Sequence, residues 1–192
     1  VQEMTELIRD FLDPAEFFQA LKNISNIDFF CGVPDSLLKD FCAYVTTHVK
    51  KENHVITANE GSAVAIASGY HLATGRTPMV YLQNSGLGNL VNPVMSLATP
   101  SVYSIPMLLL VGWRGEPGKR DEPQHLVQGQ STPGLLASLN IPFQVLPDFE
   151  EGAEQVLATA KQYMDNAKAP YCLLVKRQTF LPFKLEKKAY KL

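Results

Sequence analysis

The sequence predicts a doubly wound α/β fold, in which helices cover both faces of a mostly parallel sheet of about six strands. Short apolar runs alternate along the chain with segments whose apolar residues recur at helical spacing. Glycine, proline and aspartate residues stand at many of the junctions. Continuously apolar strands that alternate with helices are typical of a parallel sheet covered on both faces.

The start and stop residues justify the first elements. Asp13 and Pro14 give a cap followed by proline in the first turn of a helix, Gly32 and Pro34 end the first strand, and Asp35 is expected to cap the second helix together with its neighbour in the chain. The expected elements are a helix over residues 13–24, a strand over 28–33, a helix over 37–45, a strand over 54–58, a helix over 60–74, a strand over 78–84, a helix over 90–98, strands over 107–113 and 143–146, a helix over 151–165 and a strand over 171–175.

Two segments do not fit a simple strand or helix. Residues 112–133 are polar and charged, and we expect a long loop there, because unstructured connections beyond about 12–15 residues are uncommon unless they are functional or disordered. Residues 178–192 are expected to form a tail or linker, which leaves 1–177 as a single domain. The linker implies that a further domain was once attached.

Composition excludes several classes of protein. With 192 residues, 46% of them hydrophobic, the chain is long enough for one core, and its net charge of −2 gives no basic field for nucleic acid or acidic membranes. No apolar run approaches the ~20 residues of a membrane span. Cys31, Cys42 and Cys172 lie in apolar stretches without CxxC spacing, which indicates reduced core thiols in a cytoplasmic protein. A small-molecule ligand is therefore favoured.

In an open parallel sheet, ligands bind beyond the carboxyl ends of the strands. This rule points to the loops at 32–36, 59–62, 83–89 and 112–133. Glu60 stands in the second of these loops, at the start of a helix otherwise built from small and apolar residues. Its carboxylate has two interpretations: it complements the positive end of the helix, or it shares a proton with a ligand nitrogen.

Three runs carry a family resemblance: NEGSAVAIASGYHLATG from residue 59, YLQNSGLGNLVNP from residue 81 and SIPMLLLVGWRGEPGKRDEPQH from residue 104. They resemble phosphonopyruvate decarboxylases and, more distantly, the α subunit of sulfopyruvate decarboxylases, over residues 17–177. The resemblance implies the pyrimidine-domain fold of thiamine-diphosphate enzymes. In such enzymes the residue that matches Glu60 hydrogen-bonds the aminopyrimidine N1′ atom, so Glu60 is expected to activate the cofactor.

The resemblance also assigns roles to two strand-end turns. Asn84 is expected beside the reacting centre, where it would hydrogen-bond substrate or intermediate. The turn around Asp35 is expected to face the cofactor of a neighbouring subunit's half-site, with Asp35 in proton transfer. The expected cofactor contacts are Glu60, Gly32, Val33, Pro34, Asn84 and Gly86. Each turn also has a structural interpretation, since Asn84 and Gly86 shape a turn and Asp35 or Ser36 caps a helix.

The anionic substrate needs a cationic partner. Arg114 and Arg120 lie in the 112–133 segment, and a guanidinium group suits bidentate contact with a phosphonate or sulfonate. With Ser36, they are the expected substrate-binding residues. The alternative is that these mixed charges belong to an ordinary solvent-exposed loop. No cluster of His, Cys, Asp or Glu has metal-ligand spacing, so no metal ligand is predicted in this chain.

The resemblance leaves half of the cofactor unaccounted for. Related enzymes hold Mg²⁺ and the diphosphate with a Gly-Asp-Gly motif, which this sequence lacks. The chain is therefore expected to need a diphosphate-binding domain or subunit, in a homo- or hetero-oligomer, and to be inactive by itself. The expected reaction converts 3-phosphonopyruvate to phosphonoacetaldehyde and CO₂. The alternatives are a sulfopyruvate decarboxylase α subunit and a non-catalytic regulatory or binding module that kept the fold.

Overall fold

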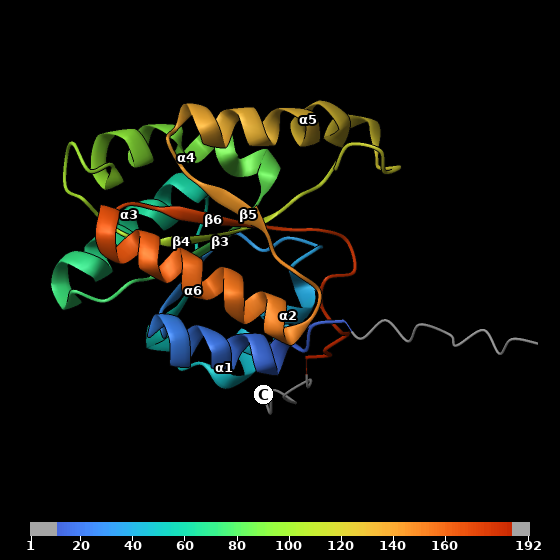
Figure 1. Cartoon of the computed structure of the whole chain (residues 1–192), viewed down its shortest axis with the longest axis horizontal. Coiled ribbons are helices and arrows are strands. Elements are labelled where there is room, and N and C mark those ends of the chain that lie inside the picture. The colour runs from blue at the N-terminus through green and yellow to red at the C-terminus, as the bar shows by residue number, and fades with distance from the viewer. Residues whose placement is uncertain (1–10, 186–192) are drawn as a thin grey trace, which may run out of the picture.

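The structure, a computed structural model, describes residues 11–185 and contains one sheet with strand order β2-β1-β3-β4-β6-β5 (Figure 1). Every neighbouring pair of strands is parallel. The strands are β1 (Phe30–Gly32), β2 (His54–Ile56), β3 (Met79–Gln83), β4 (Leu108–Gly112), β5 (Phe143–Val145) and β6 (Tyr171–Val175). The expected sheet is thus confirmed, and it is wholly rather than mostly parallel.

Helices cover both faces of this sheet, which confirms the doubly wound architecture (Figure 1). One face carries α1 (Pro14–Ser25), α2 (Lys39–His48) and α6 (Glu150–Ala167), and the other carries α3 (Glu60–Thr74), α4 (Leu87–Pro93) and α5 (Pro123–Ser138). Shorter helical turns lie at Lys51–Asn53, Asn84–Gly86 and Val94–Ala98. Within residues 11–185, no helix is long and apolar enough to cross a membrane.

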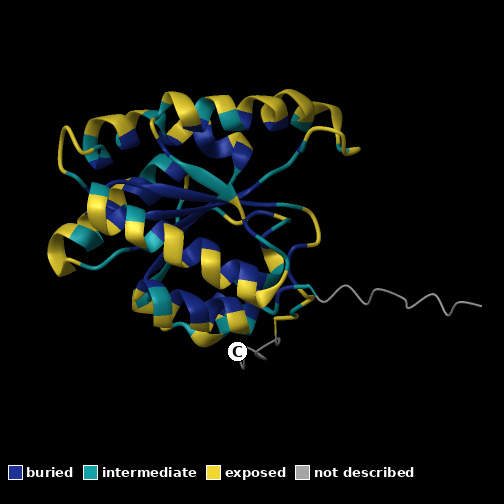
Figure 2. Cartoon of the chain, in the orientation of Figure 1, coloured by how far each residue is buried: buried dark blue, intermediate teal, exposed yellow. Residues whose placement is uncertain are grey.

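The strands divide their side chains between two cores. Along β3, Met79 and Tyr81 point toward α1, α2 and α6, whereas Val80 and Leu82 point toward α3 and α4. The sheet is therefore buried on both faces between helices whose outer sides are exposed (Figure 2). Because side chains fill both faces, polar groups that serve a ligand must lie beyond the strand ends.

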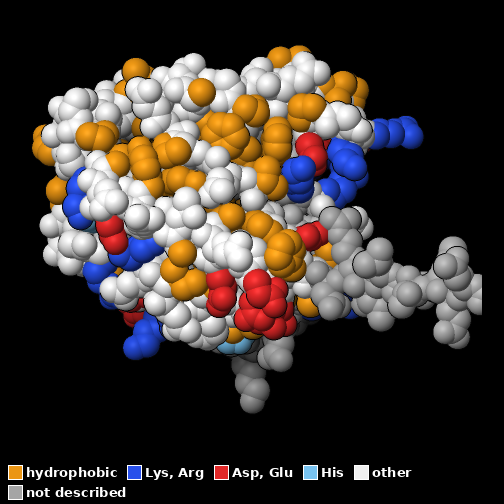
Figure 3. Space-filling view, viewed as in Figure 1, with side chains coloured by type: hydrophobic (Ala, Val, Ile, Leu, Met, Phe, Trp, Pro, Cys, Tyr) orange, Lys and Arg blue, Asp and Glu red, His pale blue; other side chains and the backbone are white. Residues whose placement is uncertain are grey.

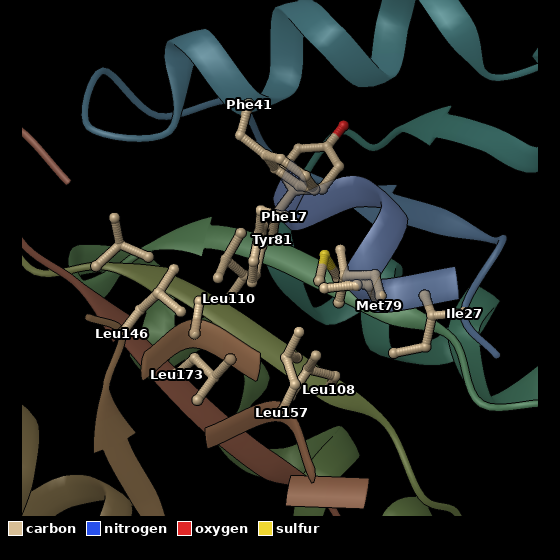
Figure 4. Close-up of a cluster of buried hydrophobic side chains, with 14 of the residues drawn as sticks. Phe17, Ile27, Phe41, Met79, Tyr81, Leu108, Leu110, Leu146, Leu157 and Leu173 are labelled. Atoms are coloured by element: carbon tan, nitrogen blue, oxygen red, sulfur yellow. The ribbon is translucent and has the colours of Figure 1, made fainter. Parts of the chain in front are cut away.

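The core under α1 and α2 combines aromatic rings with leucine and other aliphatic side chains (Figure 4). The Phe17 and Phe41 ring centroids lie 5.3 Å apart in an edge-to-face arrangement, and Phe180 lies 5.5 Å and 5.6 Å from them. Phe180 belongs to the segment that we expected to be a tail, yet it is buried and forms a parallel bridge with Leu12. Residues 178–183 thus pack on the domain, residues 186–192 lie outside the described part, and the linker role stays a prediction.

The expected caps are right for α1 and displaced for α2. The Asp13 side chain accepts a hydrogen bond from the Ala15 backbone N–H at 2.7 Å, as predicted. Helix α2 begins at Lys39, and the Asp35 carboxylate caps the preceding turn by accepting from the Leu37 N–H at 2.8 Å. Asp35 is therefore held by the backbone of its own turn, four residues before the helix starts.

The expected loop over residues 112–133 is wrong in its second half, because α5 occupies 123–138 and the connection is only 113–122. Of the α5 side chains only Thr132 and Leu136 are buried, and the helix contains Gly129 and Pro133, so apolar periodicity is weak. Backbone contact holds α5 in place: a Cβ atom on Gly129 would lie 1.7 Å from the Gly115 carbonyl oxygen. A backbone contact of this kind cannot be predicted from the pattern of side chains in the sequence.

The strand order reverses between β1 and β3. From β1 the chain moves outward to β2, and from β3 it moves the other way to β4, so the two connections leave the carboxyl ends of β1 and β3 in opposite directions. Ligands of doubly wound proteins bind at such a switch point. The loops predicted to line a site meet at this edge.

Candidate active site

Glu60 is the first residue of α3 and is buried. The Asn59 side chain caps the helix by accepting from the Ser62 N–H at 2.9 Å, which fixes the turn that carries the carboxylate. Asn89 Nδ2 donates to Glu60 Oε2 at 2.7 Å. The other oxygen, Oε1, faces Gly86, where a Cβ atom would lie only 2.2 Å away, and it accepts no hydrogen bond from residues 11–185. One carboxylate oxygen is therefore held and the other is left for a ligand.

Asp35 joins three strand ends of the sheet. Its Oδ1 accepts from Gln83 Nε2 at 2.7 Å, so the turn after β1 is tied to the last residue of β3. Gln83 Oε1 in turn accepts from Ser85 Oγ at 2.7 Å. A Cβ atom on Gly112, at the end of β4, would lie 2.1 Å from Asp35 Oδ2. The carboxylate is buried and packed against backbone that only glycine permits.

Asn84 is buried and uses its whole amide within the chain. Its Nδ2 donates to the Arg114 carbonyl at 2.8 Å and to Thr132 Oγ1 at 3.0 Å, and its Oδ1 accepts from the Arg114 N–H at 3.1 Å. Asn84 thereby fastens the end of β3 to the segment after β4 and to α5. Its expected contact with substrate stays a prediction, and its visible function is to position Arg114.

Arg114 is paired with a carboxylate of its own loop. Its Nε donates to Asp121 Oδ2 at 2.9 Å, its second terminal nitrogen donates to Asp121 Oδ1, and the remaining one donates to Ser36 Oγ at 3.0 Å. The guanidinium, with two backbone N–H groups, holds the pKa of Asp121 well below its usual range, and Asp121 raises the pKa of Arg114. Arg114 is thus largely neutralised and bridges the turns after β1 and β4.

The remaining predicted contacts lie along the same edge, except for one. A Cβ atom on Gly32 would lie 2.0 Å from the Tyr81 carbonyl oxygen, so this glycine allows β1 and β3 to approach closely. Val33 is half-buried and Pro34 is exposed at the rim. Arg120 stands apart: it is exposed and lines a cleft beside the ends of β4, β5 and β6.

Several residues that build this site were not singled out from the sequence. Asn89 orients Glu60, Gln83 holds Asp35, Thr132 accepts from Asn84, and Asp121 neutralises Arg114. Gln83 and Asn89 do lie at the two ends of the strand-end loop 83–89, so the topology rule marked their segment. Nothing in the sequence pairs Thr132 with a residue 48 positions earlier.

The cysteines are structural thiols. Cys31 is buried, with Sγ 3.4 Å from the Ala63 carbonyl oxygen, and burial raises its pKa to about 12, so it stays protonated and poorly nucleophilic. All three cysteines are free, as predicted. In the described part of the chain, no group of three His, Cys, Asp or Glu side chains is placed to hold a metal ion. The location of the Mg²⁺ ligands in another domain or subunit stays a prediction.

Residues 15–136 match the family described as thiamine pyrophosphate enzyme, N-terminal TPP binding domain, and the chain belongs to this family. Among its relatives is a phosphonopyruvate decarboxylase of Streptomyces viridochromogenes, 32% identical over 70% of this chain and 34% of the relative. Another is the sulfopyruvate decarboxylase subunit alpha of Methanocaldococcus jannaschii, 33% identical over 82% of this chain and 89% of the relative. The resemblance predicted from the sequence is therefore confirmed, as is thiamine diphosphate as the cofactor class.

The fold recurs in a distant solved structure, a 2-oxoglutarate:ferredoxin oxidoreductase from Magnetococcus marinus with 2-oxoglutarate, coenzyme A and succinyl-CoA bound. The TM-score is 0.63 at 14% identity, over 96% of this chain and 35% of the other, which shows a shared fold. The chain spans about a third of the length of the phosphonopyruvate decarboxylases it matches (34%). It spans most of the length of three sulfopyruvate decarboxylase alpha subunits (85–89%).

Proposed function

We propose that this chain is the pyrimidine-binding half of a thiamine-diphosphate-dependent 2-oxoacid decarboxylase, with Glu60 holding the proton that activates the cofactor. The observation that carries the proposal is the state of the Glu60 carboxylate. It is buried at the start of α3, one oxygen is held by Asn89, and the other is free of protein hydrogen bonds beside Gly86. Oε1 is not among the fully buried unpaired atoms of the described residues, so a ligand can reach it, and a ring nitrogen is a suitable partner.

Glycines let the chain pack closely around Glu60. Gly86 and Gly61 have no side chains, and Cβ atoms there would lie 2.2 Å from Glu60 Oε1 and 2.8 Å from the Asn89 carbonyl oxygen. Asn89 keeps Oε2 occupied, so a proton shared with a ligand would lie on Oε1. When bound, thiamine diphosphate supplies the nucleophilic carbon and the electron sink for decarboxylation.

The diphosphate and Mg²⁺ are expected to be held by a second domain or subunit. The chain lacks a Gly-Asp-Gly motif and covers about a third (34%) of the phosphonopyruvate decarboxylases, but most (89%) of one sulfopyruvate decarboxylase alpha subunit. We infer that the chain works in an oligomer in which a partner completes the cofactor site. By itself it is expected to be inactive.

The proposed substrate is 3-phosphonopyruvate. Its C1–C2 bond breaks, CO₂ leaves, and C2 takes up a proton to give phosphonoacetaldehyde. Sulfopyruvate is the rival, and identities of 32% and 33% to the two kinds of relative do not separate them. The values of kcat/KM for the two anions in competition decide between them, because specificity is a difference in transition-state binding.

A Glu60→Gln variant tests the role of Glu60, with Glu52→Gln as the matched control because Glu52 is exposed on a neighbouring turn. Both variants are combined with the diphosphate-binding domain or subunit and assayed for CO₂ release. The amide fills the same space but cannot hold the proton, so Glu60→Gln is expected to lose about 10²–10⁴-fold in kcat. Glu52→Gln is expected to keep full activity. Full activity in Glu60→Gln would contradict the proposed mechanism.

A second candidate function is a non-catalytic binding module that kept the fold. It is favoured by Asn84 and Arg114, whose side chains are satisfied within the chain. Calorimetric titration with thiamine diphosphate and Mg²⁺ separates the candidates. The two-half model expects weak binding by the chain alone and tight binding with its partner, whereas tight binding by the chain alone would contradict it.

A further inference from the structure

A cleft of about 550 Å³ opens beyond the carboxyl ends of β4, β5 and β6. Trp113, Lys176 and Leu146, which follow β4, β6 and β5, line it. Leu37 also lines it and follows Asp35 and Ser36 in the chain. The cleft therefore adjoins the Glu60 site without including Glu60 or Asn84.

The charges of this cleft differ from those of the whole chain, which carries a net charge of −2. Four cations line it, Lys119, Arg120, Lys176 and Arg177, against three carboxylates, Glu116, Asp121 and Asp148, so that the cations exceed the acids by one. Figure 3 shows Lys and Arg side chains gathered, with an acidic side chain between them, near the loop 113–122. A positive cleft on an acidic chain points to an anionic ligand.

Two carboxylates of the cleft are paired with cations. Asp121 is held by Arg114 and lies 3.7 Å from Arg177, and Glu116 pairs with Lys176 at 2.7 Å. Lys119 and Arg120, by contrast, form no ion pair with any residue of the range 11–185. Asp121 also accepts from the Gly115 and Glu122 N–H groups, so the loop that presents Lys119 and Arg120 is fixed at both ends. Two free cations thus stand on an anchored loop.

We propose that this cleft binds a tetrahedral oxyanion group, a phosphonate, sulfonate or phosphate, between Arg120 and Lys119 on one side and Lys176 and Arg177 on the other. Guanidinium and ammonium groups from two segments complement the several oxygens of such a group. The assignment of this anion to the substrate rests on the proposed function, whereas anion binding itself needs neither cofactor nor catalysis.

Trp113 provides a direct test, because it is the one tryptophan of the chain and Lys176 Nζ lies 5.9 Å from its ring centroid. The 192-residue chain is titrated with methylphosphonate while tryptophan fluorescence is followed, with sodium chloride at matched ionic strength as the reference. A saturable change is expected with methylphosphonate and not with chloride. No saturable change would overturn the proposal.

Three variants sharpen the titration. The double variant Lys119→Ala/Arg120→Ala is expected to weaken binding about tenfold or more, since charge-assisted hydrogen bonds are lost. Glu116→Gln removes a carboxylate that competes for Lys176, so binding is expected to tighten. Lys161→Ala removes a cation on α6 that is not among the cleft-lining residues and is expected to change nothing. Equal affinity in the double variant and the parent would refute the assignment.

The source of the anion is decided in the completed enzyme. If the cleft holds the substrate's anionic group, Lys119→Ala/Arg120→Ala raises KM for phosphonopyruvate and leaves kcat nearly unchanged. If it holds free phosphate, KM is unchanged and the variant loses only its response to added phosphate. Glu60→Gln is expected to bind methylphosphonate like the parent, so failure of the anion site and failure of the Glu60 mechanism give different results.

Discussion

Asp121→Ala is expected to lower the free energy of unfolding by more than the loss of an exposed ion pair does. The side chain is 7% exposed and accepts hydrogen bonds from two Arg114 nitrogens and from the Gly115 and Glu122 N–H groups. Its removal leaves the Arg114 guanidinium, itself 16% exposed, with Ser36 as its hydrogen-bond partner and without its principal counterion. A mostly buried charge is then uncompensated.

The magnitude follows from the burial of the two partners. Breaking a buried ion pair by removing one partner costs ~3–5 kcal/mol, whereas exposed pairs contribute ~0.2–1 kcal/mol. Arg114 lies at the edge of a cleft and can regain some water, so we expect the lower end of the buried range, about 3 kcal/mol. Lys161→Ala, which breaks an exposed i,i+4 pair on α6, is expected to cost about 0.5 kcal/mol or less.

Urea unfolding at pH 7 measures both variants. A loss of less than about 1 kcal/mol for Asp121→Ala would refute the reasoning, because the pair would then behave as an exposed one. Acid gives a second check. The folded-state pKa of Asp121 is lowered, so its contribution is complete above the unfolded-state pKa of about 3.9 and is lost as the pH falls toward the folded-state value. The difference between parent and variant is therefore expected to shrink below about pH 4.

Three further predictions concern the site and its support. Gly86→Ala places a Cβ atom 2.2 Å from Glu60 Oε1 and is expected to lower the activity of the completed enzyme at least about tenfold, whereas Gly88→Ala meets no atom within 4 Å and is expected to keep it. Asn84→Ala is expected to cost about 2 kcal/mol in urea unfolding, and a loss under about 0.5 kcal/mol would count against its bridging role. Burial lowers the pKa of His54, so this side chain binds a proton more readily in the unfolded chain than in the folded one. The free energy of unfolding is therefore expected to fall between pH 7 and pH 5, and to fall less steeply in His54→Gln.

Local signals account for the parts of the fold that were predicted. Asp13, Gly32 and Gly75 act within one turn of the chain, and the apolar runs of β3, β4 and β6 are contiguous, so each element follows from neighbouring residues. Glu60, Asp35 and Asn84 were predicted to lie at one edge of the sheet because each follows a strand, and the carboxyl ends of parallel strands meet at the same edge.

The features that were missed depend on contacts distant in sequence or made by backbone. Helix α5 is held by the approach of Gly115 to Gly129, which has no side-chain pattern. Arg114 was expected to be available for substrate, but composition alone does not say which of the nearby acids pairs with it, and Asp121 does. The substrate role of Arg120 stays a prediction, and its neighbours in the cleft, Lys176 and Arg177, follow β6 and are distant in sequence.

Because β6 lies between β4 and β5, one edge of β4 stays unpaired during part of the synthesis of the chain. The apolar strand β4 leaves the ribosome roughly 60 residues before β6, which at about 5–20 residues per second leaves one edge of β4 unpaired for roughly 3–12 seconds. The bridge between Leu12 and Phe180 forms later still. The nascent chain thus carries an open strand edge, prone to aggregation, until β6 emerges and pairs with β4.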